Sequence, residues 1–522
     1  MSGADAEAAV LIVGGGPVGL TARALLERWG VPTLLVEKHT EMSPFPRARL
    51  VNVRSMEIFR QLGLATRIAA NGFAPAYGRV RFRDTLFAPD FATAGMVGVD
   101  APVPESPVIG VLTSQDRLEP TLLAAAEGTL RFGVELVDLT EEAEGVTALL
   151  VDRRHGEESR VRARYLIAAD GANSTVRKRL GIGTAGPGVI GSFTSVVFDA
   201  DLGHWRAEQP AGIYFTPHGT FGPVHPEGGW VWFHATPGDA GGADWSGPLS
   251  RALGPGADVR VDVARVQRWT MTAHVADRLR HGRVLLAGDA AHAVPPIGGL
   301  GMNTGVADAH NLCWKLAGVL QGWAGPGLLD SYQTERHPVA RETLRQAVDN
   351  TRLLLQVLNA RNEQLRAGTA ASTPTELPWS ERYFAQLGLV LGTTYHSDAV
   401  LSDHREPPEP SGTEYVPTAE PGRRMPHFWL TPGRSTLDTV GEWFTLLTQA
   451  PSRWQQQAPA SWPLRFETLL GEHARLCRVG PHGGALLVRP DGHIAARWEE
   501  PPANGSTLRH ALTAVTSRLA GG

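Results

Sequence analysis

Short apolar runs and amphipathic stretches take turns at the start of the chain. The apolar run 10–13 leads into a glycine-rich turn, and apolar positions then recur at helical spacing as far as Gly30, which fits a helix C-cap. A second apolar run, 33–36, ends in Glu37. Strand, tight turn, helix, strand and acid form the order that a dinucleotide-binding unit requires.

The pattern of a buried strand followed by a polar loop recurs further along the chain. The apolar stretches 164–169 and 283–287 predict two such strands, which lead into Asp170 and Asp289. Apolar residues at helical spacing predict helices over 53–62, from about 116, from about 302 and over 329–359.

The pattern changes between about 188 and 275. The segments 193–198, 212–215 and 230–234 are rich in aromatic and β-branched residues, and turn residues separate them. The segment 79–83 alternates in the same strand-like way. We therefore expect a mainly antiparallel sheet, separate from the dinucleotide unit.

The end of the chain forms a further unit. The proline-rich stretch 406–410 marks a linker. After it come the apolar stretch 443–447, a strand-like stretch at 484–488 and a closing helix over 508–519, and no internal repeat is visible.

Composition narrows the classes of function. The chain has 522 residues, which suggests about three domains. Its net charge of −4 and its interspersed charges speak against binding to nucleic acid or a membrane surface. With two cysteines, Cys313 and Cys477, we expect no disulfide framework, no metal site and a reducing cytosol. Neither a signal peptide nor a membrane-spanning apolar run is visible, so we expect a cytoplasmic protein.

The glycine-rich turn has the residues that pyrophosphate binding needs. Gly14 permits the turn, Gly16 lets the backbone approach the ligand, and Gly19 lets the helix pack on the strand. The pyrophosphate would lie at the helix N-terminus. Glu37, close to the usual position about 20 residues later, would accept hydrogen bonds from ribose hydroxyls. The alternative is a glycine turn without a ligand.

Three separated motifs each follow a predicted strand, and in an open α/β sheet such loops line one crevice. The set resembles that of the single-component FAD-dependent aromatic hydroxylases, which include p-hydroxybenzoate and phenol hydroxylases, and it is most similar to members that act on polyketides. The resemblance covers nearly the whole chain and is carried by the glycine turn and by the segments 46–48, 169–177, 288–304, 308–316 and 332–338. Leu300 stands where many members have Gln.

The resemblance implies an architecture of three parts. These are an α/β Rossmann-like FAD-binding domain, an inserted, mainly antiparallel β-sheet domain for the substrate, and a thioredoxin-like C-terminal domain that lacks the redox cysteines. The expected boundaries are 1–73, 98–187 and 276–395 for the FAD-binding domain, 74–97 and 188–275 for the substrate domain, and 396–522 for the linker and the C-terminal domain.

The resemblance also implies the residues that bind the cofactors FAD and NADPH. Asp170 would serve both cofactors, because no second glycine turn is visible. The full expected set is Gly14, Gly16, Pro17, Gly19, Glu37, Lys38, Arg47, Gln115, Asp170, Asp289, Gly301, Met302 and Asn303.

The implied reaction is hydroxylation of a phenolic or polyketide-type ring. NADPH would reduce FAD, and molecular oxygen would then form a flavin hydroperoxide that transfers oxygen to the ring. A nearby proton acceptor helps such a reaction, and the candidates are Tyr214, His225 and His234. The expected substrate pocket contains Tyr214, Phe215, Trp230, Trp232, Pro295 and Pro296.

Several alternatives stay open at this point. Baeyer–Villiger oxygen insertion and a ligand-sensing flavoprotein would use the same motifs. Trp230 and Trp232 share one strand face and would equally suit a packed core. The cluster 177–179 would hold the NADPH phosphate or form a solvated helix face, and His292 would be structural. The oligomeric state is open, with a homodimer as one option.

Overall fold

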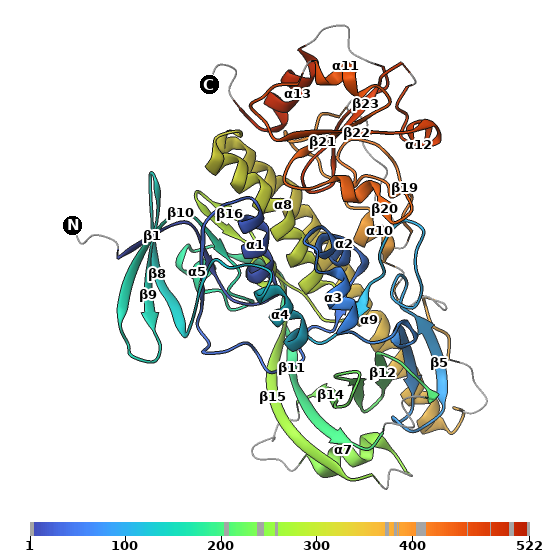
Figure 1. Ribbon diagram of the computed structural model, residues 1–522. Coiled ribbons are helices and arrows are strands. Elements are labelled where there is room, and N and C mark those ends of the chain that lie inside the picture. Colours follow the sequence, from blue (N-terminus) through green and yellow to red (C-terminus); the bar gives the residue numbers. More distant parts are fainter. Residues whose placement is uncertain are drawn as a thin grey trace.

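The structure is a computed structural model. It describes residues 5–202, 208–236, 245–255, 259–370, 375–379, 384, 386–402, 414–456, 458–480, 482–500 and 506–518. The predicted linker at 406–410 lies outside these residues. Figure 1 shows a central α/β part, a curved sheet below it and the C-terminal unit above it.

A mixed sheet of eight described strands forms the centre. Its order is β16-β17-β10-β1-β2-β7, and β9 pairs with both β10 and β8. The neighbours from β17 to β7 pair in parallel, and parallel strands are buried on both faces, which explains their continuous apolar runs. The strands are β1 (Ala6–Val13), β2 (Thr33–Glu37), β7 (Thr129–Phe132), β8 (Val134–Glu142), β9 (Gly145–Asp152), β10 (Glu158–Ala168), β16 (Arg280–His281) and β17 (Val284–Leu286).

Helices cover this sheet, and most of them share one apolar core with it. The helices of this part are α1 (Pro17–Arg28), α2 (Val53–Gln61), α3 (Ala65–Ala70), α4 (Gln115–Leu123), α5 (Thr175–Arg179), α8 (Gly301–Gln321), α9 (Asp330–Ala367) and α10 (Leu387–Leu391), with the 3-10 turns η1 (Pro75–Tyr77), η2 (Gly288–Ala290) and η3 (Pro326–Leu329). In the part of the chain that the structure describes, none of the helices combines the length and the apolar character needed to cross a membrane.

The second sheet follows the order β18-β15-β11-β14-β13-β12-β4-β5. Its pairs are antiparallel except for β12 and β4. The strands are β4 (Arg79–Arg83), β5 (Asp90–Gly95), β11 (Thr184–Ala200), β12 (Ile213–Thr216), β13 (Gly219–Pro223), β14 (Trp230–Ala235), β15 (Val261–Ala276) and β18 (His292–Ala293). Two short strands, β3 (Leu50–Val51) and β6 (Val111–Leu112), pair beside it.

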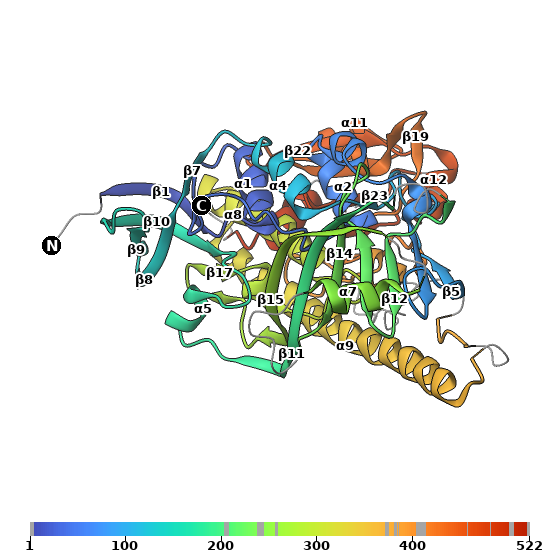
Figure 2. The ribbon, with the colours of Figure 1, turned by 90° about the horizontal axis from the view of Figure 1, so that it is seen from below.

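Different elements cover the two faces of the second sheet. On one face, which we call the α7 face, Tyr214 and Trp230 pack with α7 (Ser246–Leu253). On the other, which we call the α9 face, Phe82 and Phe215 pack with Leu354 of α9. Figure 2 shows α9 running alongside this sheet. Neighbouring residues on one strand therefore lie in different environments.

The C-terminal unit contains a four-stranded sheet of order β22-β21-β23-β24. Only the β21–β22 pair is parallel. The elements are β19 (Trp429–Thr431), β20 (Arg434–Ser435), η4 (Thr436–Thr439), β21 (Phe444–Thr448), α11 (Pro451–Gln455), β22 (Leu464–Thr468), α12 (Gly471–Leu476), β23 (Ala485–Val488), β24 (Ile494–Trp498) and α13 (Thr507–Val515).

The strands β11 and β15 extend beyond what the sequence pattern indicated. The predicted strand 193–198 is the C-terminal part of β11, and β15 was not predicted. Much of the paired length of these strands is exposed. An exposed ribbon is held by backbone hydrogen bonds and needs no apolar alternation, so periodicity does not detect it.

Candidate active site

The glycine turn between β1 and α1 brings two chain segments into close approach. Gly14 has a φ of 112°, and a β-carbon there would lie 2.2 Å from the carbonyl oxygen of Ala169. A β-carbon at Gly19 would lie 2.0 Å from the carbonyl oxygen of Gly14. At Gly16, by contrast, a β-carbon would have no neighbour within 4 Å. The turn is therefore tight on the protein side and open at Gly16.

Helix α1 begins at Pro17 directly after this open position. No side chain caps its N-terminus, and Pro17 occupies the position where a missing N–H costs nothing. Uncapped amides and the helix dipole favour an anionic group at such an end. The N-terminus of α1 is thus suited to a phosphate.

Glu37 lies beside the same turn because β1 and β2 are paired in parallel. Its Oε2 accepts a hydrogen bond from the backbone N–H of Gly15 at 2.7 Å, and its Oε1 accepts one from that of His39 at 2.9 Å. Lys38 is exposed. The carboxylate that was expected to meet a ribose is held at the edge of the glycine turn.

Asp170 follows β10, the other neighbour of β1. Its Oδ2 accepts a hydrogen bond from the N–H of Val176 at 3.1 Å, whereas its buried Oδ1 has no partner among the described residues. Burial raises the pKa of this carboxyl group. The Asp170 carboxyl group therefore has an acceptor position that a ligand hydroxyl would satisfy.

Arg177 connects the segment after β10 to the segment after β17. It is buried and donates hydrogen bonds to the carbonyl oxygens of Ala290 at 2.7 Å and Ala172 at 2.8 Å. Lys178 and Arg179 are exposed. Of the basic cluster 177–179, one member is structural and two lie on a solvated surface.

Asp289 follows β17, which pairs in parallel with β10. Asp289 is exposed at the surface of the described residues. The protein groups packed around its carboxyl group partly desolvate it, and this raises its pKa. Behind it, Asp308 Oδ2 lies 2.6 Å from His292 Nε2, and Asp308 Oδ1 accepts from Arg336 Nε at 2.7 Å. Burial opposes ionisation of Asp308, but the two bases lower its pKa to about 2. His292 thus anchors this loop, as expected.

The N-terminus of α8 and the loop at 47–52 are fastened together by Asn303. Its Nδ2 donates to the carbonyl oxygens of Leu50 at 2.9 Å and Gly299 at 2.7 Å, and its Oδ1 accepts from the N–H of Asn52 at 2.9 Å. No side chain caps α8 at Gly301, and Met302 is half-buried. Asn303 positions backbone, while the uncapped first turn is suited to an electron-rich ligand edge.

The same loop is held from the other side by α4. Gln115 accepts a hydrogen bond from the N–H of Ala48 at 3.3 Å and donates one to Glu119 at 2.6 Å. Glu119 is buried, and this raises its pKa to about 7, although Gln115 and Arg47 oppose the shift. Arg47 is exposed. Sequence reasoning missed Glu119, although its spacing from Gln115 placed both on one helix face.

The structure does not bring the three predicted acid–base residues together. Tyr214 is fully buried under α7, where its hydroxyl donates to the carbonyl oxygen of Gln209 at 2.7 Å. His234 stacks on Trp232 with ring centroids 4.2 Å apart and also contacts Trp245. Trp230 and Trp232 belong to the same core. The α7 face is thus packed protein.

Phe215 lies on the opposite face and packs against Phe82, with centroids 5.2 Å apart. The prediction that Tyr214 and Phe215 line one pocket is therefore wrong, because adjacent strand residues point to opposite faces. Pro295 is buried and Pro296 exposed in the loop before α8, close to Ile297, which packs on the α9 face. Of the predicted pocket, Phe215 and this loop share a face.

His225 lies in the turn between β13 and β14 and contacts the start of α4. Its Nδ1 is 3.2 Å from Ser114 Oγ, and its Nε2 is 3.4 Å from Asp116 Oδ2. Burial lowers its pKa although Asp116 opposes the shift. His225 therefore joins the second sheet to the helix that carries Gln115.

A second residue that sequence reasoning missed is Arg49. Its side chain leaves the 47–52 loop and reaches the second sheet, where Nη1 donates to the carbonyl oxygen of Pro223 at 3.1 Å and Nη2 to that of Gly212. Burial lowers its pKa to about 10. The one signal in the sequence was a second arginine two residues after Arg47.

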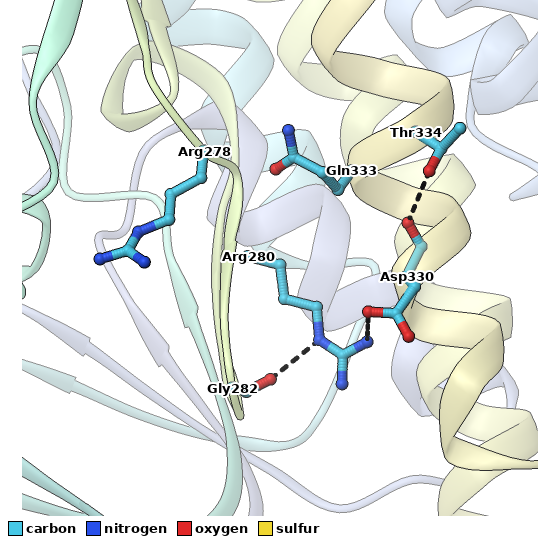
Figure 3. A pocket seen from close by; sticks show the side chains of 6 residues that line it. All are labelled: Arg278, Arg280, Gly282, Asp330, Gln333 and Thr334. Atoms are coloured by element: carbon cyan, nitrogen blue, oxygen red, sulfur yellow. Dashed lines mark hydrogen bonds and ion pairs between the residues drawn. The ribbon is translucent and has the colours of Figure 1, made fainter.

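An open polar hollow lies away from all these residues. It is lined by Arg278, Arg280, Gly282, Asp330, Gln333 and Thr334, and Arg280 pairs with Asp330 at 2.7 Å (Figure 3). It adjoins β16 and the start of β17, whereas Asp289 follows the other end of β17. The hollow is separate from the candidate site.

Three motifs thus meet at the carboxyl ends of β1, β10 and β17, as a dinucleotide site in an open sheet requires. Fold and site define a dinucleotide-binding α/β protein with an attached aromatic sheet. The FAD binding domain family matches residues 7–347, and the aromatic-ring hydroxylase C-terminal family matches residues 418–518. The chain belongs to the flavin-dependent aromatic-ring hydroxylases.

Named relatives agree with this family. Aklavinone 12-hydroxylase DnrF of Streptomyces peucetius is 36% identical over 86% of this chain and 93% of its own length. Tetracenomycin A2 monooxygenase-dioxygenase of Streptomyces glaucescens is 35% identical over 99% and 98%. The flavin-dependent monooxygenase PieE, solved with FAD and substrate, matches with a TM-score of 0.90 and 34% identity, covering 99% of this chain and 100% of PieE.

Proposed function

We propose that the protein is an FAD- and NADPH-dependent monooxygenase that hydroxylates a phenolic or polyketide-type aromatic ring. The observation that carries this proposal is the meeting of the glycine turn, Asp170 and Asp289 at adjacent strand ends. The aklavinone and tetracenomycin enzymes support it because they are a hydroxylase and a monooxygenase-dioxygenase. A solved aklavinone-11 hydroxylase with FAD and aklavinone, at a TM-score of 0.84 and 33% identity, supports it through its ligands.

The described residues fit FAD. The open position at Gly16, the uncapped end of α1 and Glu37 suit the ADP half. The unpartnered Oδ1 of Asp170 and the exposed residue Asp289 suit ligand hydroxyls. We assign the ADP half to Gly14, Gly16, Pro17, Gly19, Glu37 and Lys38, and the remainder to Arg47, Gln115, Asp170, Asp289, Gly301, Met302 and Asn303.

Bound FAD supplies the oxygen-activating redox chemistry that side chains lack. The chain positions the reactants and keeps water away from them. Asn303 fixes the 47–52 loop against α8, and Gln115 fixes the same loop against α4. We place the substrate on the side of the α9 face, near Phe215 and the 295–297 loop, because this loop leads into the N-terminus of α8 that we assign to FAD.

Of the three predicted acid–base residues, His225 is the one in contact with α4. Burial favours its neutral form, which can accept a proton. We therefore retain His225 as the candidate proton acceptor. Replacement by Gln should lower hydroxylation without loss of bound flavin.

The test is to follow flavin reduction by NADPH without oxygen, with and without a panel of phenols and polycyclic hydroxyquinones, and to identify the product formed in air. A compound that accelerates reduction and gains a hydroxyl group supports the proposal. An ester product would indicate Baeyer–Villiger insertion instead. A protein whose FAD neither NADPH nor NADH reduces would overturn the proposal in favour of a ligand-binding flavoprotein.

A matched pair of glycine variants tests the FAD assignment separately. Gly16→Val places a side chain in the open space of the turn, so FAD affinity should fall at least about tenfold while the apoprotein stays folded. Gly228→Ala also adds atoms in open space, on the β13–β14 turn, and should leave FAD affinity unchanged. Equal FAD affinities would contradict the assignment.

A further inference from the structure

Arg49 spans the junction between the cofactor-binding part and the second sheet. Its backbone carbonyl accepts a hydrogen bond from the N–H of Thr113, which fixes the residue beside β6. Its guanidinium lies against Gly222 of β13, where a β-carbon would be 2.0 Å from Nη1. Gly222 pairs with Val231, whereas the α7-face residue Phe221 pairs with Trp232. The guanidinium therefore lies on the α9 face, where we place the substrate.

No acid neutralises this cation among the residues that the structure describes. Three buried arginines elsewhere have carboxylate partners: Arg83 has Asp90, Arg336 has Asp308 and Arg424 has Glu57. Buried Arg23 and Arg177 bond to carbonyl oxygens, but the nearby charges of Glu27 and Asp170 partly oppose the effect of burial on their pKa. Arg49 has two carbonyl oxygens, and burial lowers its pKa without an opposing acid. An uncompensated buried charge is costly, so it calls for a ligand or a function.

The guanidinium also keeps unused hydrogen-bonding capacity. A guanidinium has five N–H donors, and the two described bonds of Arg49 use Nη1 and Nη2. Arg23, which is also held by carbonyl oxygens, uses Nε, Nη1 and Nη2 and makes four bonds. Arg49 retains accessible surface. Its guanidinium group therefore has N–H donors that the described hydrogen bonds do not use, and these can bind a negatively charged partner.

We propose that Arg49 binds an ionised oxygen of the aromatic substrate, and that the substrate is a ring whose phenol is acidic enough to bind as the phenolate. This inference rests on the proposed function and names its substrate class. A cation next to a phenol favours the charged form of that phenol. The phenolate makes the ring more electron-rich, so Arg49 would select and orient a ring that is prepared for hydroxylation.

The test uses the FAD-loaded protein and two probes, 1,8-dihydroxyanthraquinone and its dimethyl ether. The absorbance of the hydroxyl probe moves to longer wavelength on ionisation, so a pH titration gives the pKa of the bound phenol. In the wild type this pKa should lie about one unit or more below that of the free probe. Arg49→Gln should abolish that shift and weaken the hydroxyl probe about tenfold or more, but leave the dimethyl ether unchanged.

Two further variants separate charge from architecture. Arg49→Lys keeps the charge and should retain part of the shift in the phenol pKa. Gly222→Ala keeps the arginine, but its methyl group displaces the guanidinium, so the shift should be lost. Bound flavin and thermal stability of each variant show whether the fold is intact.

Each outcome bears on the inference. If Arg49→Gln binds both probes like the wild type, with the same bound pKa, Arg49 is only a strut between the two parts. If the wild type binds neither probe while NADPH reduces its flavin in the presence of another phenol, the substrate class is wrong and the proposed function stands. If neither nicotinamide reduces the flavin with any compound, the proposed function itself fails.

Discussion

Two junctions of this molecule bury arginines in opposite ways. Where the C-terminal unit meets the central part, Arg489 donates to Glu335 Oε1 at 2.6 Å and also binds Asp491. Lys315 donates to Glu335 Oε2 at 2.7 Å. All four side chains are buried. Where the central part meets the second sheet, Arg49 has carbonyl oxygens alone.

The difference appears in the acidity of the two arginines. Burial lowers the pKa of both, but Asp491 and Glu335 reverse the effect for Arg489 and raise its pKa. For Arg49 the lowering remains. A buried charge that is paired with an opposite charge links two units, whereas a buried charge without a counter-ion can still bind an oppositely charged ligand. We therefore interpret the C-terminal junction as structural and the junction at Arg49 as the proposed ligand-binding one.

The largest effect should come from breaking the paired junction. Arg489→Met leaves Glu335 and Asp491 buried with Lys315 as the remaining cation, so the free energy of unfolding should fall by about 3–5 kcal/mol. Urea unfolding of the FAD-loaded protein measures this. Arg434→Ala, which removes a surface pair with Glu467, should cost at most about 1 kcal/mol. Equal costs would mean that the buried network does not hold the junction.

A smaller effect is expected from Glu119, a buried acid whose only described hydrogen bond comes from an amide. Because its pKa is raised to about 7, the folded protein binds a proton that the unfolded chain releases above its ordinary value. Stability should therefore decrease by about 1–3 kcal/mol as pH rises from about 5 to 7. Glu119→Gln should flatten this part of the pH profile. An unchanged profile would show that Glu119 ionises normally.

Sequence reasoning recovered the central α/β part because its burial is regular. The runs 10–13, 164–169 and 283–287 are apolar throughout, since their strands are covered on both faces. The ends of these strands then placed Asp170 and Asp289 beside the glycine turn. Topology alone brought the three motifs together, without knowledge of any side-chain contact.

The second sheet was harder, because strand character does not say which face meets which neighbour. Tyr214, Trp230 and Trp232 pack in the core under α7, although the sequence pattern predicted that they line a substrate pocket. The sequence did not single out Arg49 and Glu119, because what distinguishes them is that neither has an ion-pair partner among the residues that the structure describes. A partner that is far away in sequence, or absent, leaves no local pattern.

The different roles of the two faces of the second sheet can be tested with a variant that loses one hydrogen bond. Tyr214→Phe removes the hydroxyl that donates to Gln209, which should cost about 1 kcal/mol of stability. Since Tyr214 lies in the α7 core, the hydroxylation rate should change less than about twofold. Steady-state kinetics and thermal unfolding measure both quantities. A decrease of about a hundredfold in the hydroxylation rate would indicate that Tyr214 takes part in acid–base catalysis after all.

The smallest effect on stability should come from a substitution of Arg49. This substitution tests directly whether Arg49 differs from the paired arginine Arg489. Arg49→Met removes two hydrogen bonds to carbonyl oxygens, but it also removes a charge that burial disfavours and keeps most of the apolar stem. Because these effects oppose each other, the free energy of unfolding should change by less than about 1 kcal/mol in either direction. The same substitution at Arg489 should cost several times more. Urea unfolding of the two methionine variants side by side measures the difference. If both lost the same amount, Arg49 would be as structural as Arg489, and the distinction between paired and unpaired junctions would not hold.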